Sequence, residues 1–124
     1  TFAGSVPAIV AQSAYTFAGP QATVTTTALQ RLTGAATTSL GAAANIPNVR
    51  VDLCYQPNGG GVLTNFSGFA YVEHPFTVAR VPYTAVGSVV PGAGTWKVGL
   101  CVYNPTATSI NQTNYMNGWV QVTN

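Results

Sequence analysis

The stretch GTWKVGLCVY, residues 94–103, alternates apolar side chains with other side chains. Its apolar face consists of Trp96, Val98, Leu100 and Val102. Its other face carries Lys97, Cys101 and Tyr103. Because successive side chains of a strand point to opposite faces, this period of two predicts a β-strand with one face on a core.

The stretch VRVDLCYQ, residues 49–56, shows the same pattern around the other cysteine, Cys54. Its apolar face consists of Val49, Val51, Leu53 and Tyr55, and Cys54 lies on the other face with Arg50, Asp52 and Gln56. We therefore expect two neighbouring strands of one sheet, joined by a Cys54–Cys101 disulfide on the face away from the core. Antibody domains differ, because their disulfide joins the two sheets. Two buried free thiols are the alternative.

Short β-branched and aromatic runs, separated by Gly, Pro and Asn, fill most of the chain and favour antiparallel strands. The expected strands cover 22–27, 29–33, 36–40, 49–56, 62–65, 68–73, 77–81, 84–90, 94–103 and 115–123. No convincing helix is visible. The prediction is an all-β antiparallel β-sandwich, Ig-like or jelly-roll, over residues 21–124, preceded by an extended apolar arm over residues 1–20.

Charge is scarce, since only 5% of the residues are charged and the net charge is +2. The four basic residues are scattered, so nucleic-acid binding is not expected. Two cysteines and one histidine make an incomplete ligand set, so we expect neither a metal nor a cofactor. His74 and Glu73 are adjacent and point to opposite strand faces, which argues against a catalytic pair. We therefore expect a protein that is not an enzyme.

The compartment follows from the cysteines and from the apolar runs. An even number of cysteines in a chain rich in Thr, Asn and Gly favours an oxidising compartment, so we expect a secreted, extracellular or cell-surface protein. The apolar runs are far shorter than the roughly 20 residues of a membrane span, so the chain is not expected to cross a membrane. Because the chain begins at Thr1, we expect a processed protein, with an excised domain as the alternative.

The stretches 94–104 and 117–122, with the strand, cysteine and turn pattern described above, resemble the last strands of small β-sandwich modules in secreted bacterial surface proteins. The resemblance covers the C-terminal third of the chain. It implies secretion and a β-sandwich, and it carries no catalytic signature.

The apolar arm suggests self-assembly. Its candidate assembly residues are Phe2, Val6, Ala8, Ile9, Val10 and Phe17. An extended apolar strand can add to the sheet edge of a neighbouring copy, as in donor-strand exchange. Head-to-tail addition does not close, so it gives a pilus-like filament. The alternatives are an arm that folds back as the first strand of its own sandwich and an arm that lies on the surface.

Tyr103, Tyr115 and Trp119 are candidate ligand residues near strand ends. Aromatic faces beside amide side chains are what a sugar site needs, although such rings also pack in cores and across strands. The leading hypothesis is therefore a structural subunit that assembles with copies of itself into a fibre or surface layer. The alternative is a carbohydrate-binding or adhesion module that recognises surface glycans.

Overall fold

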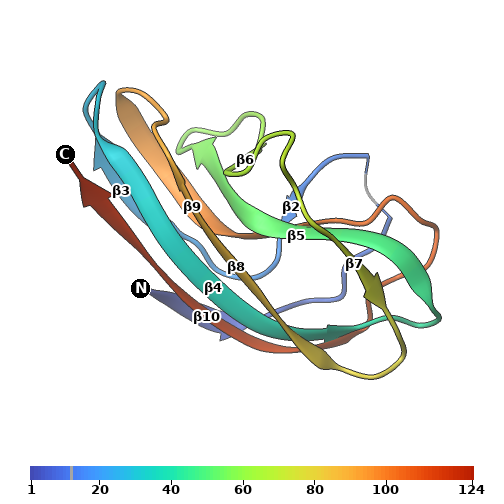
Figure 1. The fold of residues 1–124 in the computed structure, drawn as a ribbon. Coiled ribbons are helices and arrows are strands. Elements are labelled where there is room, and N and C mark those ends of the chain that lie inside the picture. The colour runs from blue at the N-terminus through green and yellow to red at the C-terminus, as the bar shows by residue number, and fades with distance from the viewer. Residues whose placement is uncertain (12) are drawn as a thin grey trace.

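The computed structural model describes residues 1–11 and 13–124 and contains two antiparallel β-sheets packed face to face (Figure 1). The prediction of an all-β sandwich is confirmed. The strands are β1 (Phe2–Ser5), β2 (Thr16–Phe17), β3 (Ala22–Thr26), β4 (Arg31–Gly41), β5 (Ile46–Pro57), β6 (Thr64–Asn65), β7 (Glu73–Phe76), β8 (Val81–Val89), β9 (Gly94–Tyr103) and β10 (Gln112–Thr123). Within these residues there is no helix long and apolar enough to cross a membrane.

The strand order interleaves the two ends of the chain. The four-stranded sheet has the order β1-β10-β4-β8. The six-stranded sheet has the order β2-β9-β5-β6, with β3 also on β9 and β7 also on β5. Early strands thus lie beside late ones, so nearly every pairing closes a long loop of chain.

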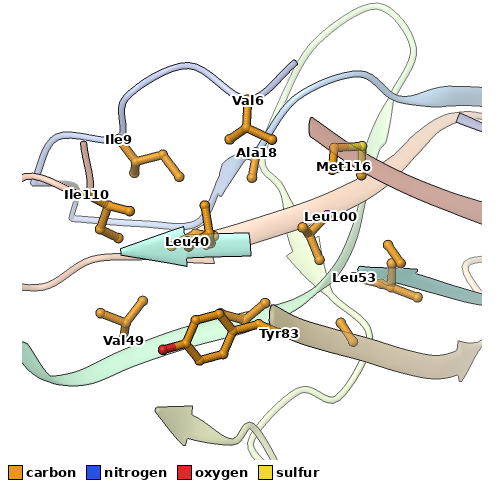
Figure 2. Close-up of a cluster of buried hydrophobic side chains, with 14 of the residues drawn as sticks. Val6, Ile9, Ala18, Leu40, Val49, Leu53, Tyr83, Leu100, Ile110 and Met116 are labelled. Carbon is orange, nitrogen blue, oxygen red and sulfur yellow. The ribbon is translucent and has the colours of Figure 1, made fainter. Parts of the chain in front are cut away.

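The core lies between the two sheets and is built from the apolar faces that the alternation predicts (Figure 2). Val98, Leu100 and Val102 of β9 are fully buried, and Leu53 of β5 is buried opposite them. Trp96 and Tyr55 lie at the margin of this core, where their rings meet edge to face at 5.4 Å. Burial of these alternate side chains fixes which face of each strand points outward.

Three regions differ from the expected strands. Residues 31–33 and 36–40 are parts of one long strand, β4, which continues through Gly34, whereas residues 29 and 30 precede it. A Cβ atom at Gly34 would lie 2.6 Å from the Trp119 carbonyl oxygen, so a glycine serves close strand approach here and does not break the strand. Most of 68–73 and of 77–81 lies outside strands, and β7 covers Glu73–Phe76 instead.

The predicted N-terminal arm is not present as a separate arm. β1 pairs with β10 of its own chain, and Ile9 forms an isolated bridge with Ile110. Phe2, Val6 and Ile9 are buried in the core, whereas Ala8 and Val10 are exposed. The half-buried Phe17 belongs to β2, which pairs with β9. The physical reason is that the free edge of β10 offers backbone partners within the same chain.

Candidate functional site

The outer face of the four-stranded sheet carries two exposed aromatic side chains, those of Tyr115 and Trp119. Along β10, Tyr115, Asn117 and Trp119 are exposed and alternate with the buried Met116. Trp119 lies opposite Ala35 of β4, which in turn lies opposite Val86 of β8. We call this surface the Trp119 face; its members are Ala3, Ser5, Thr33, Ala35, Thr37, Thr84, Val86, Ser88, Tyr115, Asn117, Trp119 and Gln121.

Small side chains form the floor of the Trp119 face. A second cross-strand row consists of Asn117, Thr37 and Thr84. Together with Ala35 and Trp119 these residues line a shallow depression of about 310 Å³. The Trp119 ring thus lies beside a shallow surface that carries polar groups. These are the Asn117 amide and the Thr37 and Thr84 hydroxyls, which lie on neighbouring strands.

The Trp119 face is almost free of charge. Arg31 begins β4 at one end of the sheet and donates a hydrogen bond to the Ser88 hydroxyl at 3.0 Å. Arg80 precedes β8 and donates to the Thr113 carbonyl oxygen at 3.2 Å. The remaining charged residues, Arg50, Asp52, Glu73 and Lys97, belong to strands of the six-stranded sheet. No charged side chain therefore opposes contact across the centre of the face.

The structure brings two of the three predicted ligand residues together. Tyr115 and Trp119 lie on the same strand and the same face, and their exposed fractions are 72% and 43%. Tyr103 belongs to the other sheet, where it lies opposite Arg50. Strand alternation alone places Tyr115 and Trp119 on one face, but it does not say which sheet each strand joins.

Tyr103 belongs to a second group of polar side chains, which we call the Arg50 cluster: Tyr15, Arg50, Tyr71, Glu73 and Tyr103. The Arg50 guanidinium carbon lies 3.6 Å from the centre of the Tyr71 ring and 4.8 Å from the centre of the Tyr103 ring. The Tyr15 and Tyr103 rings are 5.7 Å apart. Tyr15 and Tyr71 lie in irregular segments, although the sequence predicts a strand over 68–73, so sequence patterns did not place these tyrosines here.

Electrostatics distinguish Tyr15 within this cluster. Burial raises the pKa of the Tyr15 hydroxyl above its usual value of 10.0, the Asp52 charge raises it further, and the Arg50 charge opposes the increase. Burial also raises the pKa of Tyr83. Both phenols therefore hold their protons in the folded protein at a pH where an unfolded chain has begun to lose them.

We expect the free energy of unfolding to fall as pH rises above about 10, because the folded state then binds more protons than the unfolded state. The stabilisation is fully present below the unfolded pKa and is lost as pH approaches the raised folded pKa. Urea unfolding of wild-type protein and of Tyr15→Phe, measured at about pH 9 and about pH 11, tests this linkage. The loss is expected to be smaller in Tyr15→Phe; an equal loss in the two proteins would contradict the assignment.

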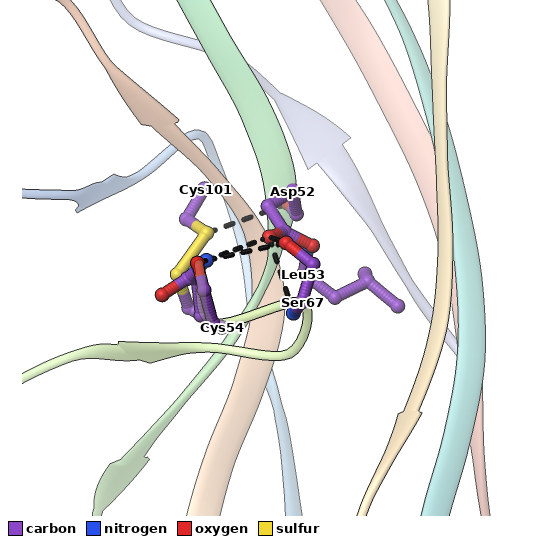
Figure 3. The surroundings of a disulfide bond; sticks show 7 residues. Asp52, Leu53, Cys54, Ser67 and Cys101 are labelled. Carbon is purple, nitrogen blue, oxygen red and sulfur yellow. Dashed lines mark hydrogen bonds between the residues drawn. A yellow bond between two sulfur atoms is a disulfide. The ribbon is translucent and has the colours of Figure 1, made fainter. Parts of the chain in front are cut away.

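Asp52 holds a third group of polar side chains together beside the disulfide (Figure 3). One carboxylate oxygen of Asp52 accepts from the Leu53 amide at 2.8 Å, and the other accepts from the Asn65 side-chain amide at 3.0 Å and from the Ser67 hydroxyl. Asp52, Ser67 and His74 line one depression of about 300 Å³. However, the His74 ring meets Tyr83 edge-on at 5.2 Å, and the Ser67 proton is directed at a carboxylate. This geometry does not join serine, histidine and aspartate in the order that nucleophilic catalysis uses.

The predicted disulfide is confirmed. Cys54 and Cys101 are bonded across β5 and β9, on the side of the strands opposite Leu53 and Leu100. Both cysteines are fully buried, and the described residues include no free cysteine. Nor do residues 1–11 and 13–124 contain a group of three or more His, Cys, Asp or Glu side chains placed to hold a metal ion.

Comparison with known proteins adds no family. No protein-family model and no curated protein matches this chain.

Proposed function

We propose that this protein is a non-enzymatic extracellular structural subunit that associates with copies of itself through the Trp119 face. The observation that carries the proposal is a row of Trp119, Ala35 and Val86 across three strands, set among short polar side chains and with no charged side chain at its centre. Interface centres are enriched in aromatic residues and depleted in charge. The buried disulfide supports an oxidising, extracellular setting.

The strand order supports a jelly-roll interpretation of the sandwich. When the two-residue strands β2 and β6 are set aside, eight strands remain. Numbered 1 to 8 along the chain, they follow the orders 1-8-3-6 and 2-7-4-5. This arrangement is a double Greek key, and we prefer it to the Ig-like alternative.

Exchange of residues 1–20 between subunits is a second proposed route to assembly, and it would lead to a filament. The contacts of β1 with β10 and of Ile9 with Ile110 would be the same if the partner strand came from another copy. The Trp119 face needs no such exchange, because it is already exposed in the folded chain. We therefore place the face first and strand exchange second.

Val86→Lys tests the Trp119 face. Val86 is 73% exposed, so lysine is accommodated in the monomer, but a charge then stands in the apolar part of the face. We expect self-association to weaken by about tenfold or more, because the buried charge would be unpaired in the assembly. Sedimentation equilibrium of the variant and of wild-type protein measures the change.

Val62→Lys is the matched control, since Val62 is 81% exposed and lies outside the face. It adds the same charge and is expected to leave association unchanged. Equal effects of the two substitutions would show that net charge, and not the Trp119 face, governs association.

A neutral polysaccharide is the second candidate partner of the same face. The Trp119 ring beside the Asn117 amide and the Thr37 and Thr84 hydroxyls is suited to stacking on a sugar and bonding its hydroxyls. Retention on insoluble cellulose or chitin, lost in Trp119→Ala and kept in Val62→Lys, would favour this adhesion function. Retention of wild-type protein on neither polymer would exclude these two glycans.

A further inference from the structure

The Arg50 cluster lies on the other sheet and offers a cation held by aromatic rings. Arg50 lies opposite both Tyr103 and Glu73 in the strand register, so its side chain is flanked from two neighbouring strands. The rings of Tyr71 and Tyr103 lie against the guanidinium, as described above. Such contact restrains the long arginine side chain before any ligand arrives, which reduces the entropy cost of binding.

The Nε donor of this arginine is buried and makes no hydrogen bond within the part of the chain that the structure describes. The nearest carboxylate oxygen, of Glu73, is 3.8 Å from Nε, which is too far for a hydrogen bond. The Tyr15 hydroxyl is also buried, and it interacts with the Arg50 side chain itself. A buried N–H donor without a hydrogen bond is uncommon in folded proteins and calls for an explanation.

A guanidinium presents its N–H donors in a planar fork that matches a carboxylate. The Arg50 side chain is 27% exposed, so an incoming group can reach the exposed part of this side chain. Three half-buried tyrosines surround it, and two of them, Tyr71 and Tyr103, have rings and hydroxyls that suit the faces and hydroxyls of a sugar. We propose that the Arg50 cluster binds a carboxylate-bearing saccharide of the uronic acid class, with Arg50 on the carboxylate and Tyr71 and Tyr103 against the sugar ring.

Glu73 gives the proposal a distinguishing consequence. Its carboxylate, 43% exposed and near Nε, competes with and repels a ligand carboxylate. Glu73→Gln keeps the size of the side chain and removes its charge, so affinity for the saccharide is expected to rise. If Arg50 served only to hold the fold together, removing its ionic neighbour would not create a gain in binding.

Calorimetric titration of the whole protein with oligogalacturonate, and with the neutral galactose oligosaccharide of equal length, tests the site. We expect the uronate alone to bind. Arg50→Lys keeps the charge but loses the planar fork, and we expect it to weaken binding by about tenfold or more. Arg31→Lys, on the other sheet, is the matched control and is expected to bind as wild-type protein does.

Several results would overturn the proposal. These are no uronate binding by wild-type protein, equal binding by Arg50→Lys, or equal binding of the neutral oligosaccharide. Equal or tighter binding of polyglutamate would assign the site to acidic peptides and reject the saccharide.

Thermal unfolding of each variant checks its folding. If Arg50→Lys is unfolded, the Glu73→Gln titration decides, since no gain in affinity there would also reject the proposal. Repeating the titration on Val86→Lys, which alters the Trp119 face, shows whether uronate binding depends on that face; we expect that it does not.

Discussion

Loss of the Cys54–Cys101 disulfide is expected to lower the free energy of unfolding by about 4 kcal/mol. The bond joins residues 47 positions apart, and in the chain-entropy model a loop of this length strongly restricts the unfolded chain. The two strands that it joins, β5 and β9, also carry Leu53 and Leu100 in the centre of the core. The effect is therefore expected to reach the whole sandwich as one cooperative unit.

Urea unfolding with and without a reducing agent measures this loss. The double variant Cys54→Ala/Cys101→Ala is the control, because a reductant should leave its unfolding unchanged. A wild-type midpoint that does not move on complete reduction would contradict the expected contribution of the disulfide.

Replacing Ile9 by Ala is expected to destabilise the protein by about 3 kcal/mol, and Phe2→Ala by a similar amount or more. Both side chains are buried, although they belong to a segment whose sequence suggests an independent arm. The Ile9 amide donates to the Ile110 carbonyl oxygen at 2.9 Å, and the Ile110 amide donates back at 2.8 Å. This backbone pairing holds the Ile9 side chain against the core.

Val10→Ala is the matched control for Ile9→Ala, because Val10 is the next residue and is 58% exposed. Its effect is expected to stay within about 0.5 kcal/mol. Thermal and urea unfolding of the three variants provide the comparison. Small and equal effects of Ile9→Ala and Val10→Ala would show that the N-terminal segment does not pack into the sandwich in solution.

The same experiment examines strand exchange. If residues 1–20 pack within their own chain, the loss of stability in Ile9→Ala is independent of protein concentration. If they pack in a neighbouring copy, unfolding is coupled to dissociation and the loss depends on concentration. A concentration series therefore distinguishes the two placements of the N-terminal strand.

The sequence predicts those parts of the fold that depend on local alternation. Residues 94–103 form β9 with the expected bounds, and Cys54 and Cys101 lie on the expected faces. Alternation fails where a glycine interrupts the pattern. Gly34 looked like a break but lies inside β4.

The partner of the N-terminal strand could not be predicted in the same way. Apolar residues at Phe2, Val6 and Ile9 indicate burial, but they do not say which sheet edge buries them. That choice depends on the free edge of β10, which is distant in sequence. The Arg50 cluster has the same origin, since Tyr15 and Tyr71 reach Arg50 only through the paths of irregular segments.

The central claim is self-association through the Trp119 face, and the light-scattering mass of wild-type protein over a dilution series tests it most directly. The account predicts a mass that is a multiple of 12.8 kDa at high concentration and falls toward 12.8 kDa on dilution. A mass of 12.8 kDa at every concentration would contradict it.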